Sequence, residues 1–142
     1  MVALILGLLI ALIAIAMAKD VDLPPRGFAL ALAALPLFYM LFALMVGDGH
    51  AMALEFAYGL PFFILGTLCF IRGFKGSGLL VVGLWALHAA YDIYHPILVE
   101  NAGVPGWYPA LCLGFDMMMV IYLLRLVSRQ SAFNISDDSV KS

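Results

Sequence analysis

Charged residues are scarce in this chain. Asp, Glu, Lys and Arg make up 11% of the 142 residues, whereas 65% are hydrophobic, and the mean hydropathy is +1.09. A soluble globular domain has about 25% charged residues. The scarcity of charge therefore excludes an ordinary soluble domain and indicates an integral membrane protein, whose main partner is the lipid bilayer.

Basic residues are too few to form a nucleic-acid interface. Seven Lys and Arg stand against nine Asp and Glu, which gives a formal net charge of -2. The basic residues lie beside apolar stretches and do not form a stripe or patch along the chain. We therefore expect no nucleic-acid partner.

Five apolar stretches are long enough to cross a hydrocarbon layer of about 30 Å as helices. Helices are predicted at about residues 2–18, 28–46, 51–71, 78–98 and 107–127. Because the loops between them are short, we expect an all-α fold in which residues 1–129 form one five-helix transmembrane bundle. Residues 130–142 are more polar, and a disordered cytoplasmic tail is predicted there.

The positive charges are unevenly distributed over this bundle. The loops at residues 47–50 and 96–106 contain no Lys or Arg. All seven basic residues fall on the other side of the bundle, at Lys19, Arg26, Arg72, Lys75, Arg125, Arg129 and Lys141. The positive-inside rule makes that side cytoplasmic. The N-terminus is then outside and the C-terminus inside, and we expect a multi-pass protein of a bacterial inner membrane.

The first apolar stretch shares one feature with secretory signal peptides. Ala16, Met17 and Ala18 resemble a cleavage site. However, no positive charge precedes the apolar run, and removal of the first helix would reverse the positive-inside pattern. We therefore expect the first helix to be retained.

Three ionisable residues interrupt the fourth apolar stretch, at His88, Asp92 and His95. Such residues are rare at bilayer depth, because each costs ~2.5–3.5 kcal/mol to insert. At about 100° per residue, their spacing places the three side chains within about 60° of one another on one helix face. Two imidazoles and a carboxylate on one face indicate a metal site or a proton-handling site.

Ionisable residues on neighbouring helices are predicted at similar depths. Glu55 is expected near the depth of Asp92, Asp116 near that of His88, and His50 at the outer mouth of the bundle. The candidate metal ligands, all in the outer half, are His50, Glu55, His88, Asp92, His95 and Asp116. The side chains expected to surround and orient them are Tyr58, Tyr91, Tyr94 and Cys112.

The two cysteines are predicted at different depths. Cys69 lies near the cytoplasmic end of the third helix and Cys112 in the outer half of the fifth, so we expect free thiols and no disulfide. Without clustered thiolates, the imidazole and carboxylate donors favour zinc or non-haem iron over Cu(I). One ion is expected to bind His88 and Asp92, or Asp92 and His95, together with Glu55 or Asp116. Two ions sharing the set is a second arrangement.

The fourth and fifth helices also carry a recognisable pattern. It consists of His88-Ala89-Ala90-Tyr91-Asp92-Ile93-Tyr94-His95, followed by Cys112-Leu113-Gly114-Phe115-Asp116. This pattern resembles a family of small bacterial integral membrane proteins of unknown function. Its members carry a His, then a Trp or Tyr followed directly by Asp, then a second His, and later a Cys-x2-Phe-Asp motif. The resemblance implies that these polar residues form one constellation, and it implies no activity.

Three functions fit this constellation. The first is a metal-dependent hydrolase or oxidase of a lipid or other apolar small molecule, with Glu55 or Asp116 as the catalytic general base. The second is a proton- or cation-handling transporter element, which in so small a bundle would require a homo-oligomer. The third is a structural or partner-binding bundle whose polar residues join the helices. The metal-dependent enzyme is the leading interpretation.

Overall fold

The computed structural model describes the backbone of residues 1–74 and 76–140 and the side chains of residues 1–74 and 76–129. Within these residues the regular structure consists of five α-helices. Their bounds are α1 Val2–Asp20, α2 Gly27–Met45, α3 Gly49–Arg72, α4 Ser77–Leu98 and α5 Tyr108–Val140. All five are long and apolar enough to cross a membrane, which confirms the predicted all-α fold and its five candidate spans.

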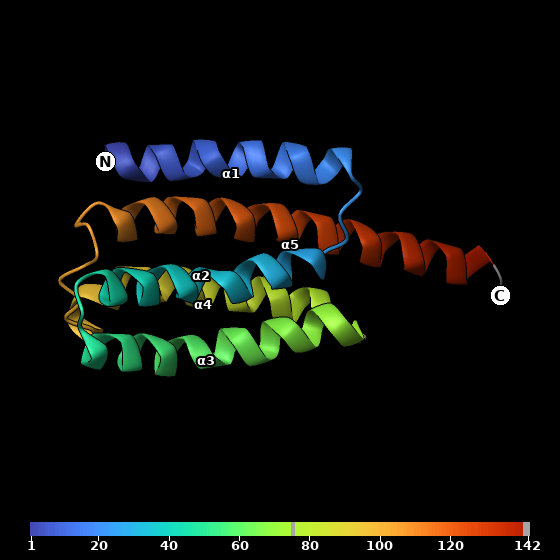
Figure 1. Cartoon of the computed structure of the whole chain (residues 1–142). Coiled ribbons are helices and arrows are strands. Elements are labelled where there is room, and N and C mark those ends of the chain that lie inside the picture. The colour runs from blue at the N-terminus through green and yellow to red at the C-terminus, as the bar shows by residue number, and fades with distance from the viewer. Residues whose placement is uncertain (75, 141–142) are drawn as a thin grey trace.

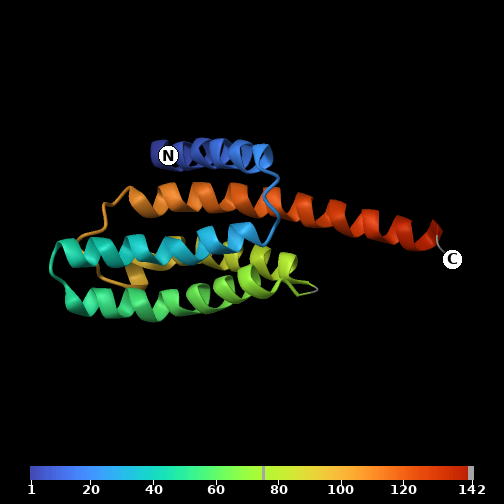
Figure 2. The ribbon, with the colours of Figure 1, turned by 45° about the vertical axis from the view of Figure 1, so that its right-hand side comes forward.

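The helices run alternately in opposite directions and are joined by short connections (Figure 1). α2 packs along α3, and α5 packs along both α1 and α4. α1 therefore lies at the edge of the bundle, with α5 between it and the other helices (Figure 1 and Figure 2). α5 continues to Val140, into the segment for which the sequence predicts a disordered tail.

Glycines permit a direct contact between α1 and α5. A Cβ atom on Gly7 would lie 2.0 Å from the carbonyl oxygen of Leu111, and one on Gly114 would lie 2.2 Å from that of Leu4. A larger residue at either position would force the two backbones apart. Close packing of small residues is the usual way for helices to associate in lipid, where no hydrophobic effect drives them together.

Two glycines of α3 allow a similar approach by α2. A Cβ atom on Gly66 would lie 2.8 Å from the carbonyl oxygen of Ala29, and one on Gly59 would lie 2.6 Å from Cβ of Pro36. These two contacts fix how far α2 is shifted along α3. They thereby set the height of the polar side chains that α2 and α3 present to the rest of the bundle.

Local sequence signals set the two ends of α3. Asp48 precedes the helix, and its Oδ1 atom accepts a hydrogen bond of 2.9 Å from the backbone N–H of Ala51, which satisfies one of the free donors of the first turn. Gly73 follows the helix with a φ of 51°, a left-handed conformation that glycine adopts without steric penalty. Glu55 is consequently held in the second turn of a well-capped helix.

The core lies where α2, α4 and α5 meet. Leu32, Trp85 and Leu123 are each fully buried there. Large aliphatic side chains cover the outer faces, as on α1, where Ile5 is 51% exposed and Ile13 is 62% exposed. So apolar an exterior would be unfavourable in water and is typical of a lipid-facing surface.

Basic residues gather at one end of the bundle. The Lys and Arg residues that the structure describes lie at the end where α1 and α3 finish. They are Lys19, Arg26, Arg72, Arg125 and Arg129. Lys75 and Lys141, which the sequence assigns to the same end, lie outside the described residues. The α2–α3 and α4–α5 connections at the opposite end carry no Lys or Arg.

Candidate metal centre

Buried polar side chains concentrate in the half of the bundle opposite the basic end. Among the described residues, six polar or charged ones are at most 9% exposed, namely Glu55, His88, Asp92, His95, Asn101 and Asp116. The residues of the α4 triplet, His88, Asp92 and His95, are each only 1–2% exposed. The predicted single buried face of this helix is therefore confirmed.

His88 is held between two carboxylates. Its Nδ1 atom lies 2.7 Å from Oδ2 of Asp116 on α5 and 3.7 Å from Oδ2 of Asp92, one turn further along α4. Tyr39 of α2 donates a hydrogen bond of 2.8 Å to Oδ1 of Asp92. Side chains of α2, α4 and α5 thus meet at this point. We call His88, Asp92 and Asp116 the triad.

Each member of the triad has a buried polar atom without a hydrogen-bond partner. The atoms are His88 Nε2, Asp92 Oδ2 and Asp116 Oδ1, and the three residues are at most 2% exposed. A buried polar atom left without a partner costs about 1–3 kcal/mol, so native proteins contain few of them. The triad therefore retains unused ligating capacity in the interior of the bundle.

The triad has the composition and spacing of a site that could hold a metal ion. Each residue offers one ligand atom, and these three atoms lie within 4.8 Å of one another. Imidazole nitrogen and carboxylate oxygen are ligands of zinc and of non-haem iron, and catalytic zinc sites use three protein ligands. A divalent ion would also offset the charge of two ionised carboxylates, which are otherwise very costly to bury. The donor set therefore fits such an ion.

Glu55 forms a second polar group next to the triad. Its Oε1 atom lies 2.8 Å from His95 Nε2 and accepts a hydrogen bond of 2.9 Å from Asn101 Nδ2. Its Oε2 atom accepts a hydrogen bond of 2.5 Å from the hydroxyl of Tyr91. Glu55 and His95, both candidate ligands from the sequence, are thus paired with each other, and the carboxylate has partners on both oxygens.

Tyr39 connects the two groups. Its ring stacks on the His95 imidazole with centroids 4.3 Å apart, while its hydroxyl donates to Asp92. Its backbone carbonyl accepts a hydrogen bond of 3.1 Å from Asn101 Nδ2. A movement of Tyr39 would therefore disturb the triad and the Glu55 group together.

Cys112 lies close to the triad along the chain. It is buried on α5, one turn before Asp116. Cys112 and Cys69 are both buried free thiols, which confirms the prediction that they form no disulfide.

The other residues singled out from the sequence lie at the margins of the site. Tyr58 is 40% exposed and Tyr94 is 56% exposed, and the ring centroid of Tyr58 is 5.7 Å from that of Tyr91. His50 is exposed in the first turn of α3. Within the described residues, no hydrogen bond or ion pair joins His50 to the triad or to the Glu55 group.

Sequence reasoning misses two residues that hydrogen-bond to the site, Tyr39 and Asn101, and one buried neighbour, Trp85. Tyr39 is the only polar side chain between residues 28 and 46, and this isolation is a signal that could have identified it. Asn101 lies in the α4–α5 connection, and its link to Glu55 spans 46 residues of sequence, for which the sequence gives no signal. Trp85, one turn before His88 on the same face of α4, has a buried Nε1–H without a partner.

Two clefts, each of about 290 Å³, approach these polar groups. The first is apolar and lies between α3 and α4, where it is lined by Phe62, Leu87 and Tyr91 among others. The ring of Phe62 also contacts that of His88 edge to face, with centroids 5.0 Å apart, so Phe62 stands between this cleft and the triad. The second lies at the α4–α5 connection and is lined in part by His95 and Asn101.

No family model matches the chain, and comparison with curated proteins and with solved structures likewise gives no match. The resemblance to small bacterial membrane proteins therefore has no support from a family model. The candidate site rests on features of this chain alone, namely five apolar helices and a buried cluster of His88, Asp92 and Asp116 that could hold a metal ion.

Proposed function

We propose that this chain is a multi-pass membrane protein that binds one divalent ion, zinc or non-haem iron, through His88, Asp92 and Asp116. The observation that carries the proposal is the triad itself, with three ligand atoms within 4.8 Å and one unpartnered buried polar atom on each residue. Side chains that serve only to join helices satisfy one another by hydrogen bonding. The unpartnered atoms of the triad therefore favour a bound ligand over a purely structural role.

We place the protein in a bacterial inner membrane with its N-terminus outside and its C-terminus in the cytoplasm. The described Lys and Arg residues all lie at one end of the bundle, and the positive-inside rule assigns that end to the cytoplasm. The triad then lies in the outer half of the membrane.

The surroundings of the triad suit hydrolysis or oxidation of an apolar substrate. When bound, the ion would supply Lewis acidity toward a carbonyl or phosphoryl oxygen. The apolar cleft between α3 and α4 lies among exposed, lipid-facing side chains, so a lipid or another apolar molecule would approach His88 past Phe62. Glu55 is held outside the triad by His95 and Tyr91, and we assign it the role of general base.

Metal content tests this proposal. We expect about one zinc or iron atom per chain in the detergent-purified protein, after reconstitution if required, because the triad supplies one set of three ligands. The variants His88→Ala and Asp116→Asn should lose the ion. His50→Ala is the matched control, because His50 is exposed and lies outside the triad. Wild-type metal content in a folded Asp116→Asn variant would contradict the proposal.

Proton or cation handling is a second candidate function, favoured by the group around Glu55. The cleft at the α4–α5 connection is lined by His95 and Asn101, which both contact Oε1 of Glu55. The ring of Tyr39 stacks on His95, and its hydroxyl donates a hydrogen bond to Asp92 of the triad. Ionisable side chains therefore follow one another from this cleft into the bundle, as in membrane proton relays. A transport path through so small a bundle would require a homo-oligomer.

Liposome flux assays distinguish these functions. A pH-dependent proton flux that is lost in Glu55→Gln, in a protein without stoichiometric metal, would support the second function. A stoichiometric ion without flux would support the first. Variants of the triad and of Glu55 that alter only thermal stability would instead assign these residues a structural role.

A further inference from the structure

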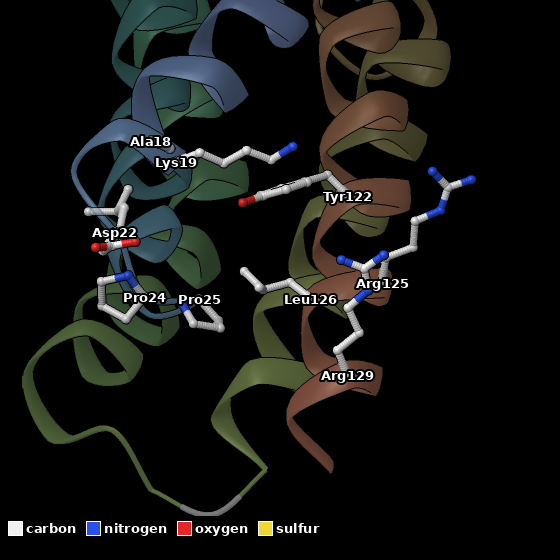
Figure 3. A pocket seen from close by; sticks show the side chains of 10 residues that line it. Ala18, Lys19, Asp22, Pro24, Pro25, Tyr122, Arg125, Leu126 and Arg129 are labelled. Atoms are coloured by element: carbon white, nitrogen blue, oxygen red, sulfur yellow. The ribbon is translucent and has the colours of Figure 1, made fainter. Parts of the chain in front are cut away.

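A third cleft lies at the basic end of the bundle, remote from the triad. It has a volume of about 510 Å³ and is bordered by the end of α1, the α1–α2 connection and α5 (Figure 3). Sites for small molecules commonly occupy about 300–1,000 Å³. The lining includes no member of the triad or of the Glu55 group, so this cleft is a separate candidate site.

The lining carries an excess of positive charge. Three cations, Lys19, Arg125 and Arg129, share the cleft with one carboxylate, Asp22, which gives a net formal charge of +2. Within residues 1–74 and 76–129, none of the three cations forms a salt bridge. Lys19 instead lies over the ring of Tyr122, with Nζ 5.6 Å from the ring centroid. A concave surface with such an excess of positive charge attracts an anion.

The cationic side chains approach the cleft from both of its walls (Figure 3). Lys19 extends from α1 toward Tyr122 of α5, and Arg129 extends back along α5 beside Leu126. The guanidinium of Arg125 points away from the α1 side of the cleft, so Arg125 lies at the rim of the cleft. An ammonium group and a guanidinium fork on facing walls suit the oxygens of a phosphate group, which arginine binds bidentately.

The cleft lies at the level where the helices leave the membrane. Lys19 is in the last turn of α1, and Arg125 and Arg129 are the first basic residues of α5, where they follow its apolar stretch. Leu23 and Leu126 are half-buried and give the cleft an apolar wall beside its charges. Basic pockets between membrane helices on the cytoplasmic side bind the headgroups of anionic lipids. Charge, depth and apolar wall thus point to the same class of ligand.

We propose that this cleft binds the phosphate group of an anionic phospholipid, with Lys19 and Arg129 as its main contacts. The acyl chains would continue along the apolar wall at Leu126, toward the lipid-facing surface of α1 and α5. Free inorganic phosphate offers the same oxygens to the cations and has no acyl chain for this wall. The lipid is therefore the expected source of the phosphate group.

Native mass spectrometry of the detergent-solubilised full chain measures this binding. The probes are phosphatidylglycerol, the zwitterionic phosphatidylcholine, and inorganic phosphate. We expect preference for phosphatidylglycerol, and a loss of about tenfold or more in Lys19→Gln/Arg129→Gln, since one basic side chain near an anionic surface contributes about fivefold. The double variant Arg26→Gln/Arg72→Gln is the matched control, because it removes the same charge from the same end but outside the cleft.

Asp22→Asn provides a test in the opposite direction. Removal of the only carboxylate of the lining should tighten the binding of phosphatidylglycerol several-fold, an effect that misfolding does not produce. The φ of Asp22 is 49°, a conformation that asparagine also tolerates. Displacement of the lipid by inorganic phosphate would support the site and identify free phosphate as its ligand. Equal affinity of the two double variants for phosphatidylglycerol would overturn the proposal.

Discussion

The hydroxyl group of Tyr39 tests how the triad is assembled. Tyr39 is 1% exposed, and its hydroxyl donates to Oδ1 of Asp92 at 2.8 Å. The substitution Tyr39→Phe removes this donor and keeps the ring that stacks on His95. Because Oδ2 of Asp92 has no hydrogen-bond partner, neither oxygen of the carboxylate would then be hydrogen-bonded within the protein.

The substitution should weaken metal binding more than it weakens the fold. Hydrogen-bond partners of metal ligands contribute about 10–100-fold in affinity, which corresponds to about 1.4–2.7 kcal/mol. Side-chain hydrogen bonds between membrane helices contribute only ~0.6 kcal/mol to stability on average. We therefore expect Tyr39→Phe to bind zinc about 10–100-fold more weakly while remaining folded.

Competition with a chromogenic chelator in detergent measures the zinc affinity. Tyr94→Phe is the matched control, because Tyr94 is 56% exposed and its hydroxyl makes no hydrogen bond within the described residues. The control should bind zinc as the unmodified protein does. An unchanged affinity in Tyr39→Phe would refute the inference that Tyr39 positions Asp92 as a metal ligand.

Three further substitutions test other parts of the structure. Gly114→Val would press a side chain against the carbonyl of Leu4 and should lower the free energy of unfolding, measured by titration with a denaturing detergent, by about 1–3 kcal/mol. Gly83→Val, where a Cβ meets nothing within 4 Å, is its control, and equal effects would argue against the close helix contact. Glu55→Gln should destabilise the fold by about 1 kcal/mol without changing the metal content, and loss of the ion would instead make Glu55 a ligand. Phe62→Leu should let a chelator remove the ion several times faster, and an unchanged rate would mean that the ion is reached by another route.

Helix periodicity predicts the face that a residue occupies but not the partner that it meets. The spacing of His88, Asp92 and His95 is fixed by the geometry of a single helix, so their common burial could be predicted from the sequence. Their partners depend on how neighbouring helices are shifted and tilted, and the sequence could only group Glu55 and Asp116 by approximate depth. In the structure, Asp116 meets His88, whereas Glu55 meets His95.

Hydropathy likewise predicts some features of the fold and leaves others open. It finds five spans because each apolar run must be long enough to cross the lipid, and α1 to α5 match these runs. Hydropathy reports residence in lipid and not helicity, so it does not foresee that α5 continues to Val140. Hydropathy also does not give the partners of Tyr39 and Asn101, because each enters the site through contacts between segments distant in sequence.

The central claim is that the imidazole of His88 and the carboxylates of Asp92 and Asp116 hold a divalent ion within the membrane. X-ray absorption at the zinc edge of the zinc-loaded protein measures that ligand shell directly. We expect only nitrogen and oxygen neighbours, at about 2.0–2.2 Å, with imidazole scattering from His88. A sulfur neighbour at about 2.3 Å, which would bring in Cys112, or the absence of a bound ion after loading with zinc and with iron(II), would contradict the claim.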